Sequence, residues 1–404
     1  MHLVILSQYY PPEIGAPQAR LSEFARGLQE RGHKITVLTA MPNYPKGKVY
    51  PGYGGIRKIE LEDGIRIIHV PIFATQKASF LPRLTSYFSF VLTALLIGGW
   101  FFPPADLLIT ESPPLFLGIA GYLLSRWKKA RWIFNVSDLW PESAVRLGIV
   151  KGGLALRLSL MLEAFCYRKA WMVSGQSKGI LKNITERFPG IRTFHFSNGV
   201  NTEIFHPKAS TLESRDILGK NGGVVALYAG LHGLAQGLDQ ILSAALMLQD
   251  QQNIVFVFIG DGPEKKSLQE IAHNLNLKNI RFIDSVPQKQ MPSIVASADI
   301  CLIPLKKHIP GAIPSKLYEA MACARPVILI AEGEAAEIVS SNQAGIVIKP
   351  GDVNGLSGAL QQMVGDPAMR ERMGESGRQA VELHFNRRKI VDDFITFLEA
   401  NTCR

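Results

Sequence analysis

The sequence is poor in cysteine. Among 404 residues it has four, Cys166, Cys301, Cys323 and Cys403, without a CxxC pair or the spacing of metal ligands. This scarcity argues against a disulfide-stabilised secreted domain and against a cysteine metal site, and it predicts a reducing, cytosolic setting. Charged residues make up 19% of the chain and hydrophobic residues 47%, so little of it should be disordered.

Two familiar motifs are also missing near the start. The apolar run Leu3–Leu6 is too short for a signal peptide and no basic region precedes it, so it predicts a first β-strand. No G-x-G-x-x-G follows that run, which argues against a nicotinamide-dependent dehydrogenase.

The net charge of +10 is concentrated in the first half of the chain. Residues 1–200 contain 24 Lys and Arg against 12 Asp and Glu, a balance of +12, whereas residues 201–404 contain 20 against 22, a balance of −2. Such asymmetry is common in ordinary basic surfaces, but it also suits attraction to an anionic membrane or to a phosphorylated acceptor.

The length favours two domains over one, and short apolar runs typical of buried strands recur in both halves. In the first half the expected strands are Leu3–Leu6, Ile35–Thr39, Ile65–Val70, Leu107–Thr110, Trp132–Val136, Trp171–Ser174 and Thr193–Phe196. In the second half they are Val224–Tyr228, Ile254–Ile259, Ile280–Ile283, Ile300–Ile303, Val327–Ile330 and Gly345–Ile348.

Helical stretches separate these runs, which is the pattern of parallel sheets covered on both faces. The Asn198-Gly199 turn marks the break between the two halves. We therefore predict two doubly wound Rossmann-like domains with a cleft between them, residues 1–198 and residues 199–385. Ligands of such sheets bind beyond the carboxyl ends of the strands.

One segment interrupts the pattern. Residues 84–105 contain no charged residue, and their length approaches the roughly 20 residues that span a bilayer. The segment could be a buried helix, a helix at the membrane interface or a true span. A span would cut the first sheet between two of its strands, so we favour the first two interpretations equally.

The segment Pro310–Val327 carries the strongest chemical signal. Ser315 is a good helix N-cap and Lys316 lies in the first turn, where backbone amides and the helix dipole favour a phosphate. Glu319 lies one turn further on the same face, spaced to reach a ribose diol while Lys316 meets a diphosphate. An ordinary surface Lys–Glu pair would have the same spacing.

The sequence Ser315-Lys-Leu-Tyr-Glu-Ala-Met-Ala-Cys-Ala-Arg-Pro-Val-Ile328 resembles the donor-binding signature of the retaining GT-B glycosyltransferases of family 4. Residues 198–207, 228–233, 236–239 and 259–263 resemble the hinge and donor loops of that family. Residues 9–20 and 137–142 are similar, more narrowly, to bacterial O-antigen and capsule enzymes of the WbuB type.

The resemblance implies roles for individual residues. Gly15 would bring backbone amides close to the donor phosphates, and Asp138 would contact the transferred sugar and stabilise developing positive charge. Asp138 could instead simply cap the next helix, and Gly15 could be a plain turn residue. With Lys316 these residues form the expected catalytic group.

The same resemblance implies a donor-binding set and a final helix that crosses back onto the first domain. Glu319 would bind the ribose, and the loops of the second domain would hold the diphosphate and the base. The expected donor-binding residues are Gly15, His232, Gly233, Gly260, Gly262, Val286, Ser315, Lys316, Leu317 and Glu319. The final helix is expected within residues 386–404, where Ile390, Phe394 and Leu398 have helical spacing.

Two positions depart from the family pattern. Gly311 stands where the family has a paired carboxylate, and Gln236 stands where it has a lysine. No arginine lies in Gly230–Gly237, so Ser315, Lys316, His232 and backbone amides remain to meet the diphosphate. A lone loop histidine is more often a surface residue.

The resemblance implies transfer of a hexosyl residue from a nucleotide diphosphate sugar with retained configuration. No DxD-like motif is evident, so no metal and no other cofactor is expected. The expected acceptor is a polyprenyl-diphosphate-linked sugar at the inner face of the cytoplasmic membrane, with the protein attached peripherally to anionic lipid and no nucleic-acid partner. A UDP-linked N-acetylfucosamine-like donor is a guess from the WbuB resemblance.

Two other functions fit the same fold. A nucleotide-sugar 2-epimerase would need carboxylates and a histidine poised for proton abstraction, which the sequence does not assemble. A non-catalytic, membrane-associated sugar-binding subunit would bind the nucleotide sugar at the same site but would not transfer its sugar.

Overall fold

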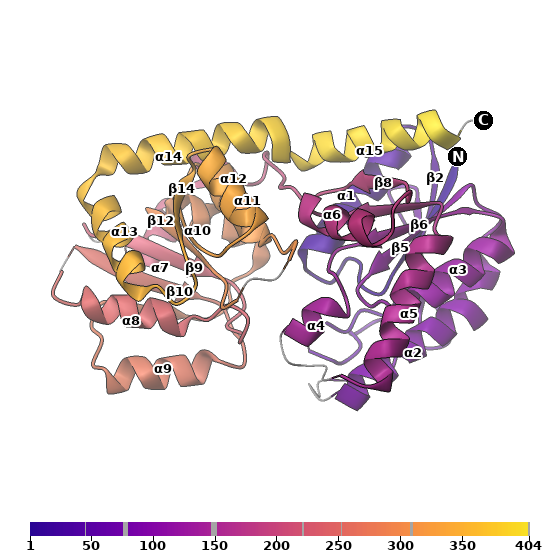
Figure 1. Cartoon of the computed structure of the whole chain (residues 1–404), viewed down its shortest axis with the longest axis horizontal. Helices are drawn as coiled ribbons and strands as arrows, with labels where there is room; N and C mark the ends of the chain where they lie inside the picture. The colour runs from indigo at the N-terminus through magenta and orange to yellow at the C-terminus, as the bar shows by residue number, and fades with distance from the viewer. Residues whose placement is uncertain are drawn as a thin grey trace. The chain divides into compact units, whose positions relative to one another are not determined.

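The structure, a computed structural model, describes residues 1–44, 46–75, 80–146, 152–219, 222–251, 253–307 and 310–402 (Figure 1). The chain divides into two compact units, Met1–Asn198 with Arg388–Arg404, and Gly199–Arg387. Each unit is a Rossmann-like α/β domain, so the predicted fold class is confirmed.

The first unit contains an eight-stranded sheet in the order β3-β4-β2-β1-β5-β6-β7-β8. Its strands are β1 (His2–Ser7), β2 (Lys34–Ala40), β3 (Lys58–Glu62), β4 (Ile65–Val70), β5 (Leu107–Ser112), β6 (Arg131–Val136), β7 (Met172–Gly175) and β8 (Thr193–His195). Neighbouring strands are parallel except at the edge, where β3 runs antiparallel to β4. Strand β3 was not predicted, because its side chains Ile59 and Leu61 are exposed and it contains no buried apolar run.

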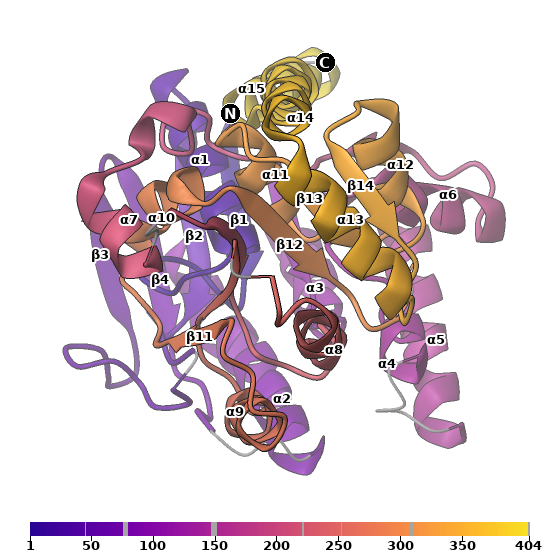
Figure 2. The same ribbon diagram turned by 90° about the vertical axis from the view of Figure 1, so that its left-hand side faces the viewer.

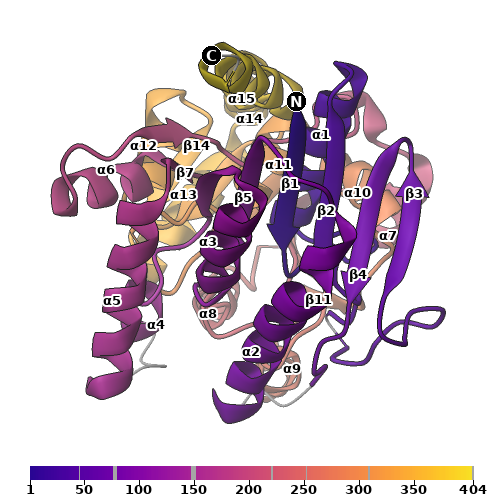
Figure 3. The same ribbon diagram turned by 90° about the vertical axis from the view of Figure 1, so that its right-hand side faces the viewer.

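The helices of the first unit cover both faces of this sheet (Figure 3). They are α1 (Ala16–Glu30), α2 (Phe80–Leu96), the 3-10 turn η1 (Gly98–Phe101), α3 (Leu117–Lys128), α4 (Glu142–Arg146), α5 (Leu154–Lys169), α6 (Lys178–Arg187) and α15 (Arg387–Thr402). Within β1, Leu3 and Ile5 face α1 and α15, whereas Val4 and Leu6 face the side that α2, α3, α5 and α6 cover. This period of two is expected for a sheet buried on both sides.

The final helix α15 packs on the first unit, as predicted. Phe394 stacks on Phe24 of α1 at a ring distance of 5.2 Å and also contacts Phe196. At the surface, Arg31 forms ion pairs with Asp392 and Glu399 of α15. The apolar stripe predicted for the chain end is therefore buried against α1 and the sheet.

The segment 84–105 forms most of α2 and the turn η1. Phe90, Val91 and Ala94 are buried against the sheet, whereas Leu92, Leu96 and Trp100 are more than half exposed. Length and composition make Leu81–Phe101 the one stretch of the described residues that could cross a membrane, with a third of it buried inside the protein. The segment thus combines a buried stripe with an exposed apolar stripe.

The second unit contains a six-stranded parallel sheet in the order β11-β10-β9-β12-β13-β14 (Figure 2). Its strands are β9 (Val224–Ala229), β10 (Ile254–Ile259), β11 (Ile280–Ile283), β12 (Ile300–Pro304), β13 (Val327–Ile330) and β14 (Gly345–Ile348). All six coincide within one residue with the runs expected from the sequence. They are apolar and rich in β-branched residues, and β9, β10, β12 and β13 are largely buried, which is the pattern of strands covered on both faces.

The helices of the second unit also lie on both faces of its sheet. They are η2 (Pro207–Ala209), α7 (Leu212–Leu218), α8 (Asp239–Met247), α9 (Lys265–Asn274), η3 (Gln288–Gln290), α10 (Met291–Ser297), α11 (Ser315–Ala322), α12 (Glu334–Ser341), α13 (Val353–Gly365), α14 (Pro367–Ala380) and the π-helical turn η4 (Val381–Phe385). Helices α10, α11 and α12 share one apolar cluster, and α8, α9 and α13 share the other.

A buried ion pair lies under the carboxyl end of the first sheet. The guanidinium of Arg20 in α1 has no exposed surface and donates to both carboxylate oxygens of Glu111 at the end of β5, at 2.8 and 3.0 Å. Arg20 also donates to Ser137, which follows β6, and to Asn198, which follows β8. One side chain thus connects four segments that are distant in sequence.

Neutral side chains complete this network. Asn135 donates to Glu111 at 2.7 Å and accepts from Ser174 at 2.7 Å, so β5, β6 and β7 are connected side by side. Gln176 donates to the carbonyl of Ser137 and accepts from Asn198. Because a buried charge is tolerated only when it is paired and hydrogen-bonded, the network fixes the backbone of the loop that begins at Ser137.

We predict that removing either charge destabilises the first unit. The variants Arg20→Met and Glu111→Gln should each lower the free energy of unfolding by about 3–5 kcal/mol, since each leaves an unpaired buried partner. The double variant Arg20→Met/Glu111→Gln should lose clearly less free energy of unfolding than the sum of the two single-variant losses. All five tryptophans, Trp100, Trp127, Trp132, Trp140 and Trp171, lie in this unit, so tryptophan fluorescence in urea reports its unfolding. Additive losses would contradict the pairing.

Candidate functional site

Helix α11 begins one residue earlier than the sequence indicates. Pro314 is its N-cap residue and Ser315 is its first helical residue, so the expectation that Ser315 caps the helix is wrong. Proline has a fixed φ and no N–H, which suits this position and leaves the amides of the next residues at the helix start.

The side chain of Lys316 lies against the loop after β9. A Cβ built on Gly230 would come within 2.0 Å of the Lys316 Cε and 2.4 Å of its Nζ, so only glycine fits there while Lys316 keeps this position. The Lys316 ammonium is 6.0 Å from the centre of the Tyr228 ring. Sequence reasoning did not single out Gly230, which directly follows β9 and lies two residues after the predicted strand Val224–Tyr228.

Glu319 lies one helical turn from Lys316, as the spacing predicts. Together they line a small cavity of about 20 Å³ under the carboxyl ends of β9 and β12, large enough for about one water molecule. Burial raises the pKa of Glu319, partly offset by the positive charges of Lys316 and Arg387. Burial likewise lowers the pKa of Lys316, partly offset by Glu319.

These two charges have no direct partner within the described ranges of the chain. No hydrogen bond or ion pair of the Lys316 ammonium or of the Glu319 carboxylate occurs there, and the two groups do not pair with each other. Half-buried charges without partners are costly. An arrangement of this kind is stabilised when an anion and a hydroxyl-bearing group approach it from solvent.

Glycines let the loops after β9 and β10 pack together. A Cβ on Gly260 would lie 2.0 Å from the carbonyl oxygen of Gly230, and a Cβ on Gly262 would lie 2.3 Å from that of His232. Both glycines have positive φ, at 142° and 157°, which L side chains rarely adopt. The predicted glycines are therefore needed for loop packing, independently of any ligand.

Backbone hydrogen bonds fasten the same two loops. The His232 N–H donates to Asp261, and the Glu264 N–H donates to the His232 carbonyl. Lys265, which the sequence did not point to, extends its ammonium under the second loop and donates to the Gly260 carbonyl at 2.9 Å and to Asp284 at 2.6 Å. Asp284 directly follows β11, so three strand ends are connected here.

The imidazole of His232 is fully buried, so the alternative that it is an ordinary surface histidine is wrong, and its predicted contact with the donor stays a prediction. It packs among the rings of Tyr228, Phe258 and Phe282. Neither ring nitrogen has a hydrogen-bond partner among the described residues. Burial, with the charge of Lys265, lowers the pKa of His232 to about 4, so the ring is neutral at neutral pH. In this position it supports the loop from below.

The remaining residues of the predicted donor set lie around these loops. Gly233 is buried beside the Gln236 side chain, whose amide oxygen is also buried and has no hydrogen-bond partner in the described part of the chain. Val286 follows β11 and packs on the core of this unit. The Leu317 side chain is fully buried in that core, so it can offer a ligand only its backbone.

In the first unit, Gly15 is the N-cap residue of α1. Its φ of 171° is ordinary extended backbone, so glycine is not required for conformation. The side chain of Gln18 covers it, since a Cβ on Gly15 would lie 2.3 Å from the Gln18 amide oxygen. The structure thus places Gly15 at a helix start, beyond the carboxyl end of β1.

Asp138 follows β6 and is held by a neighbouring helix residue. The hydroxyl of Ser143 in α4 donates to its carboxylate at 2.8 Å. Burial raises the pKa of Asp138, and the hydrogen bonds from Ser143 and from the Leu139 backbone partly offset this. The preceding residue, Ser137, belongs to the buried Arg20–Glu111 network, so the position of Asp138 depends on it.

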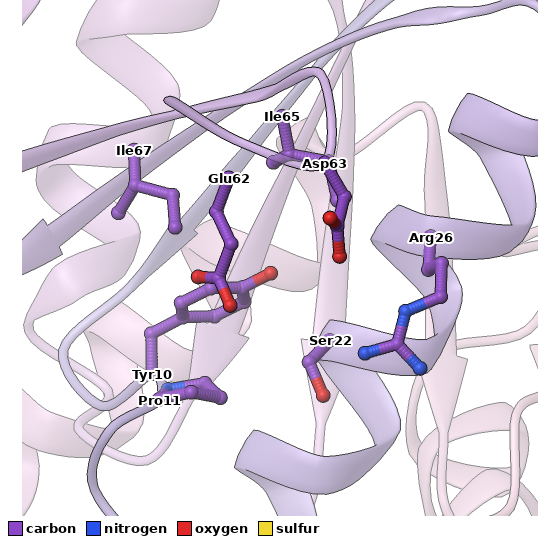
Figure 4. A pocket seen from close by; sticks show the side chains of 8 residues that line it. All are labelled: Tyr10, Pro11, Ser22, Arg26, Glu62, Asp63, Ile65 and Ile67. Carbon is purple, nitrogen blue, oxygen red and sulfur yellow. The ribbon is translucent and has the colours of Figure 1, made fainter. Parts of the chain in front are cut away.

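Two further hollows have the wrong charge for a diphosphate. One, of about 80 Å³, lies between the loop after β1, helix α1 and the β3–β4 hairpin (Figure 4). In Figure 4 the Glu62 carboxylate lies over the Tyr10 ring and the Asp63 carboxylate points toward Arg26. The other, of about 190 Å³, lies beside Gly233 and contains Asp239, Glu264 and Lys306. Each has two carboxylates against one cation.

No group of three or more His, Cys, Asp or Glu side chains that could hold a metal occurs in the described part of the chain. Cys166, Cys301 and Cys323 are buried free thiols, and Cys403 lies outside the described residues. Positive charge at the start of α11 comes from Lys316 and the helix itself. The arrangement can bind a phosphate group and stabilise negative charge that develops on it.

Two family models match most of the chain. The model described as "Glycosyl transferase 4-like domain" matches residues 15–199, and the model described as "Glycosyl transferases group 1" matches residues 210–380. These ranges correspond to the first and second units.

Similar proteins and structures agree with this. The putative colanic acid biosynthesis glycosyl transferase WcaI of Escherichia coli is 25% identical over 82% of this chain and 84% of its own. The probable glycosyltransferase WbjE of Pseudomonas aeruginosa is 25% identical over 64% of this chain and 66% of its own. The solved structure of Anabaena HepE in complex with UDP superimposes with a TM-score of 0.74, at 16% identity, over 99% of this chain and 100% of the HepE chain.

We predict that His232 makes the second unit less stable in acid. Its pKa is 6.5 when unfolded and about 4 when folded, so the unfolded chain gains a proton first as the pH falls. This costs on the order of 2–3 kcal/mol between pH 7 and pH 4, and full stability is present above pH 6.5.

The variant His232→Phe should lose less stability over this pH range, because it removes the titrating ring and its two unpartnered nitrogens. Because all five tryptophans lie in the first unit, a calorimetric transition without a change in tryptophan fluorescence is the unfolding of the second unit. The stability of the second unit is measured from that transition. His273→Phe, at an exposed position of α9, is the control. An equal acid loss in wild type and His232→Phe would show that the ring is not responsible.

Proposed function

Because this chain belongs to the glycosyltransferases built from a 4-like and a group 1 domain, we propose that it transfers a hexosyl residue from a nucleotide diphosphate sugar with retained anomeric configuration. The observation that carries the proposal is the half-buried pair Lys316 and Glu319 at the start of α11, which has no direct charged partner among the described residues. The proposed donor is UDP-linked.

The donor's chemistry matches this pair. The diphosphate accepts hydrogen bonds from the amides at the start of α11 and pairs with the Lys316 ammonium. The ribose diol donates to the Glu319 carboxylate, three residues further along the same helix face. Glycines 230, 260 and 262 hold the surrounding loops close enough to form the floor of the site.

The proposed reaction breaks the bond between the anomeric carbon and the donor phosphate oxygen. The electron pair goes to the diphosphate, where Lys316 and the helix start stabilise the charge. The acceptor hydroxyl attacks the same face of the sugar, and its proton goes to a donor phosphate oxygen, so no protein base is required. Asp138 stabilises positive charge on the sugar, and Gly15 offers backbone amides to the phosphates. We propose that no metal takes part.

The proposed acceptor is a polyprenyl-diphosphate-linked sugar of surface polysaccharide assembly, at the inner face of the cytoplasmic membrane. The excess of 12 positive charges in residues 1–200 supports a phosphorylated acceptor and an anionic surface. The similarity of residues 9–20 and 137–142 to enzymes of the WbuB type supports an N-acetylfucosamine-like sugar.

We predict different ligand losses for the two residues. Lys316→Gln should weaken binding of both inorganic pyrophosphate and UDP, because it removes the charge that both ligands need. Glu319→Gln should weaken binding of UDP alone, because pyrophosphate has no ribose. Titration calorimetry measures both, and Lys266→Gln is the matched control, since Lys266 is the exposed second residue of α9.

In a transfer assay with a polyprenyl-diphosphate acceptor, Lys316→Gln and Glu319→Gln should each lower the rate about 100-fold or more. EDTA should leave the wild-type rate unchanged. Wild-type rates in both variants would refute the site. Epimerised donor in a reaction without acceptor would refute transfer in favour of a 2-epimerase.

A further inference from the structure

The outer helices of the first unit leave an apolar face uncovered. Helices α2, α3 and α5 lie side by side over one face of the sheet, and each buries only its inner stripe (Figure 3). The outer stripe of a surface helix is ordinarily polar. Here six large apolar side chains are between 44% and 72% exposed: Leu81, Leu92, Leu96, Trp100, Trp127 and Leu158. We call this set the outer face.

The helical spacing shows that the exposure is systematic. On α2, Leu81, Phe88, Leu92 and Leu96 form one stripe with intervals of seven, four and four residues, and all four are exposed. The buried residues Phe90, Val91 and Ala94 form the opposite stripe. Helix α2 is therefore apolar on both sides, although among the described residues the outer stripe contacts protein mainly at Phe88, whose ring lies 4.8 Å from that of Phe116. Large contiguous apolar patches of this kind mark interaction sites.

Two tryptophans join the helices of the outer face. Trp100 of η1 and Trp127 of α3 meet edge to face with ring centres 5.0 Å apart. This contact requires Gly99, since a Cβ there would lie 2.4 Å from the Trp127 ring. Exposed tryptophans beside a leucine stripe are typical of side chains at the boundary between lipid and water.

The exposed charged residues of the three helices, together with Lys129 directly after α3, are positive. Arg83, Arg126, Lys129 and Arg157 are exposed on or beside the three helices. The only carboxylate in the three helices is Glu163, which is buried and paired with Arg187. A second copy of this chain would bring the same positive charges against them, whereas anionic lipid headgroups would neutralise them.

We propose that the outer face is a membrane-docking surface. Leucines and tryptophans enter the headgroup region of an anionic bilayer, and Arg83, Arg126, Lys129 and Arg157 meet its phosphates. The surface lies flat on the membrane, because the inner stripes of the same helices hold the sheet. This deepens the proposed membrane location and rests on that part of the proposed function.

The orientation also brings the candidate residues of this unit near the lipid. The first half of α2 lies close to the loop after β1, because Arg83 and Tyr87 of α2 interact electrostatically with Tyr9 in that loop. Gly15 follows in the same loop. A membrane along α2 therefore borders the carboxyl end of the sheet, where an acceptor held in the bilayer by its lipid chain could arrive.

Flotation of the full chain with vesicles tests the proposal without donor or acceptor, so its failure leaves the sugar transfer untouched. Wild type should bind vesicles of phosphatidylcholine with phosphatidylglycerol, and bind pure phosphatidylcholine weakly. The variant Leu92→Gln/Leu96→Gln should partition about tenfold or more weakly. The control Leu61→Gln/Leu212→Gln, at leucines 77% and 78% exposed outside the outer face, should bind as wild type.

A second variant separates charge from apolar contact. Arg126→Gln/Lys129→Gln should lose about tenfold in binding to anionic vesicles and about half of the salt dependence, since Arg83 and Arg157 remain, and it should keep the weak binding to phosphatidylcholine. Equal binding by wild type and Leu92→Gln/Leu96→Gln would overturn the proposal. A second result would also overturn it: wild type that does not bind vesicles and sediments as a dimer, while Leu92→Gln/Leu96→Gln sediments as a monomer. The outer face would then be an interface between two copies of the chain.

Discussion

The close approach of the loops after β9 and β10 is the constraint on which the candidate donor site depends. Gly230, Gly260 and Gly262 allow backbone carbonyls and the Lys316 side chain to come within distances that no Cβ would permit. Parallel strands end at the same edge of a sheet, so these loops meet the start of α11 there. Aromatic rings and His232 pack beneath these loops. Lys316 and Glu319 lie at the start of α11.

In the first unit the strand ends are held together by a buried ion pair and its hydrogen bonds, whereas glycines allow the close contacts in the second unit. Arg20 connects the ends of β5, β6 and β8 through Glu111, Ser137 and Asn198, all of them buried. A buried network of this kind adds little net stability, but it specifies one arrangement of the strand ends. Asp138 directly follows Ser137 of this network, so the network fixes where the Asp138 carboxylate lies.

Much of the fold was accessible from the sequence because its strands are buried on both faces. Thirteen of the 14 strands coincide with apolar runs, and α15 has the spacing of a buried stripe. The strand β3 was missed because edge strands need no such run, as the exposed Leu61 shows. The start of α11 was wrong by one residue, since Ser315 and Pro314 are both acceptable at a helix start.

The details of the site were less predictable, because they depend on contacts between distant residues. Nothing in the local sequence distinguishes His232, which is buried, from a surface histidine, nor Lys265, which fastens two loops, from a solvated lysine. The same holds for Gly230, whose importance comes from Lys316, 86 positions later. The outer face is a related case: residues 84–105 are apolar in sequence, but only the packing of α2 separates core from exposed surface.

The central claim is that Lys316 and Glu319 hold the diphosphate and the ribose of a nucleotide sugar donor. A crystal structure of the protein with UDP tests it most directly. We expect phosphate oxygens within hydrogen-bond distance of the Lys316 ammonium and of the amides at the start of α11, and the ribose hydroxyls on the Glu319 carboxylate. UDP bound elsewhere, with Lys316 and Glu319 unchanged and facing solvent, would contradict the account.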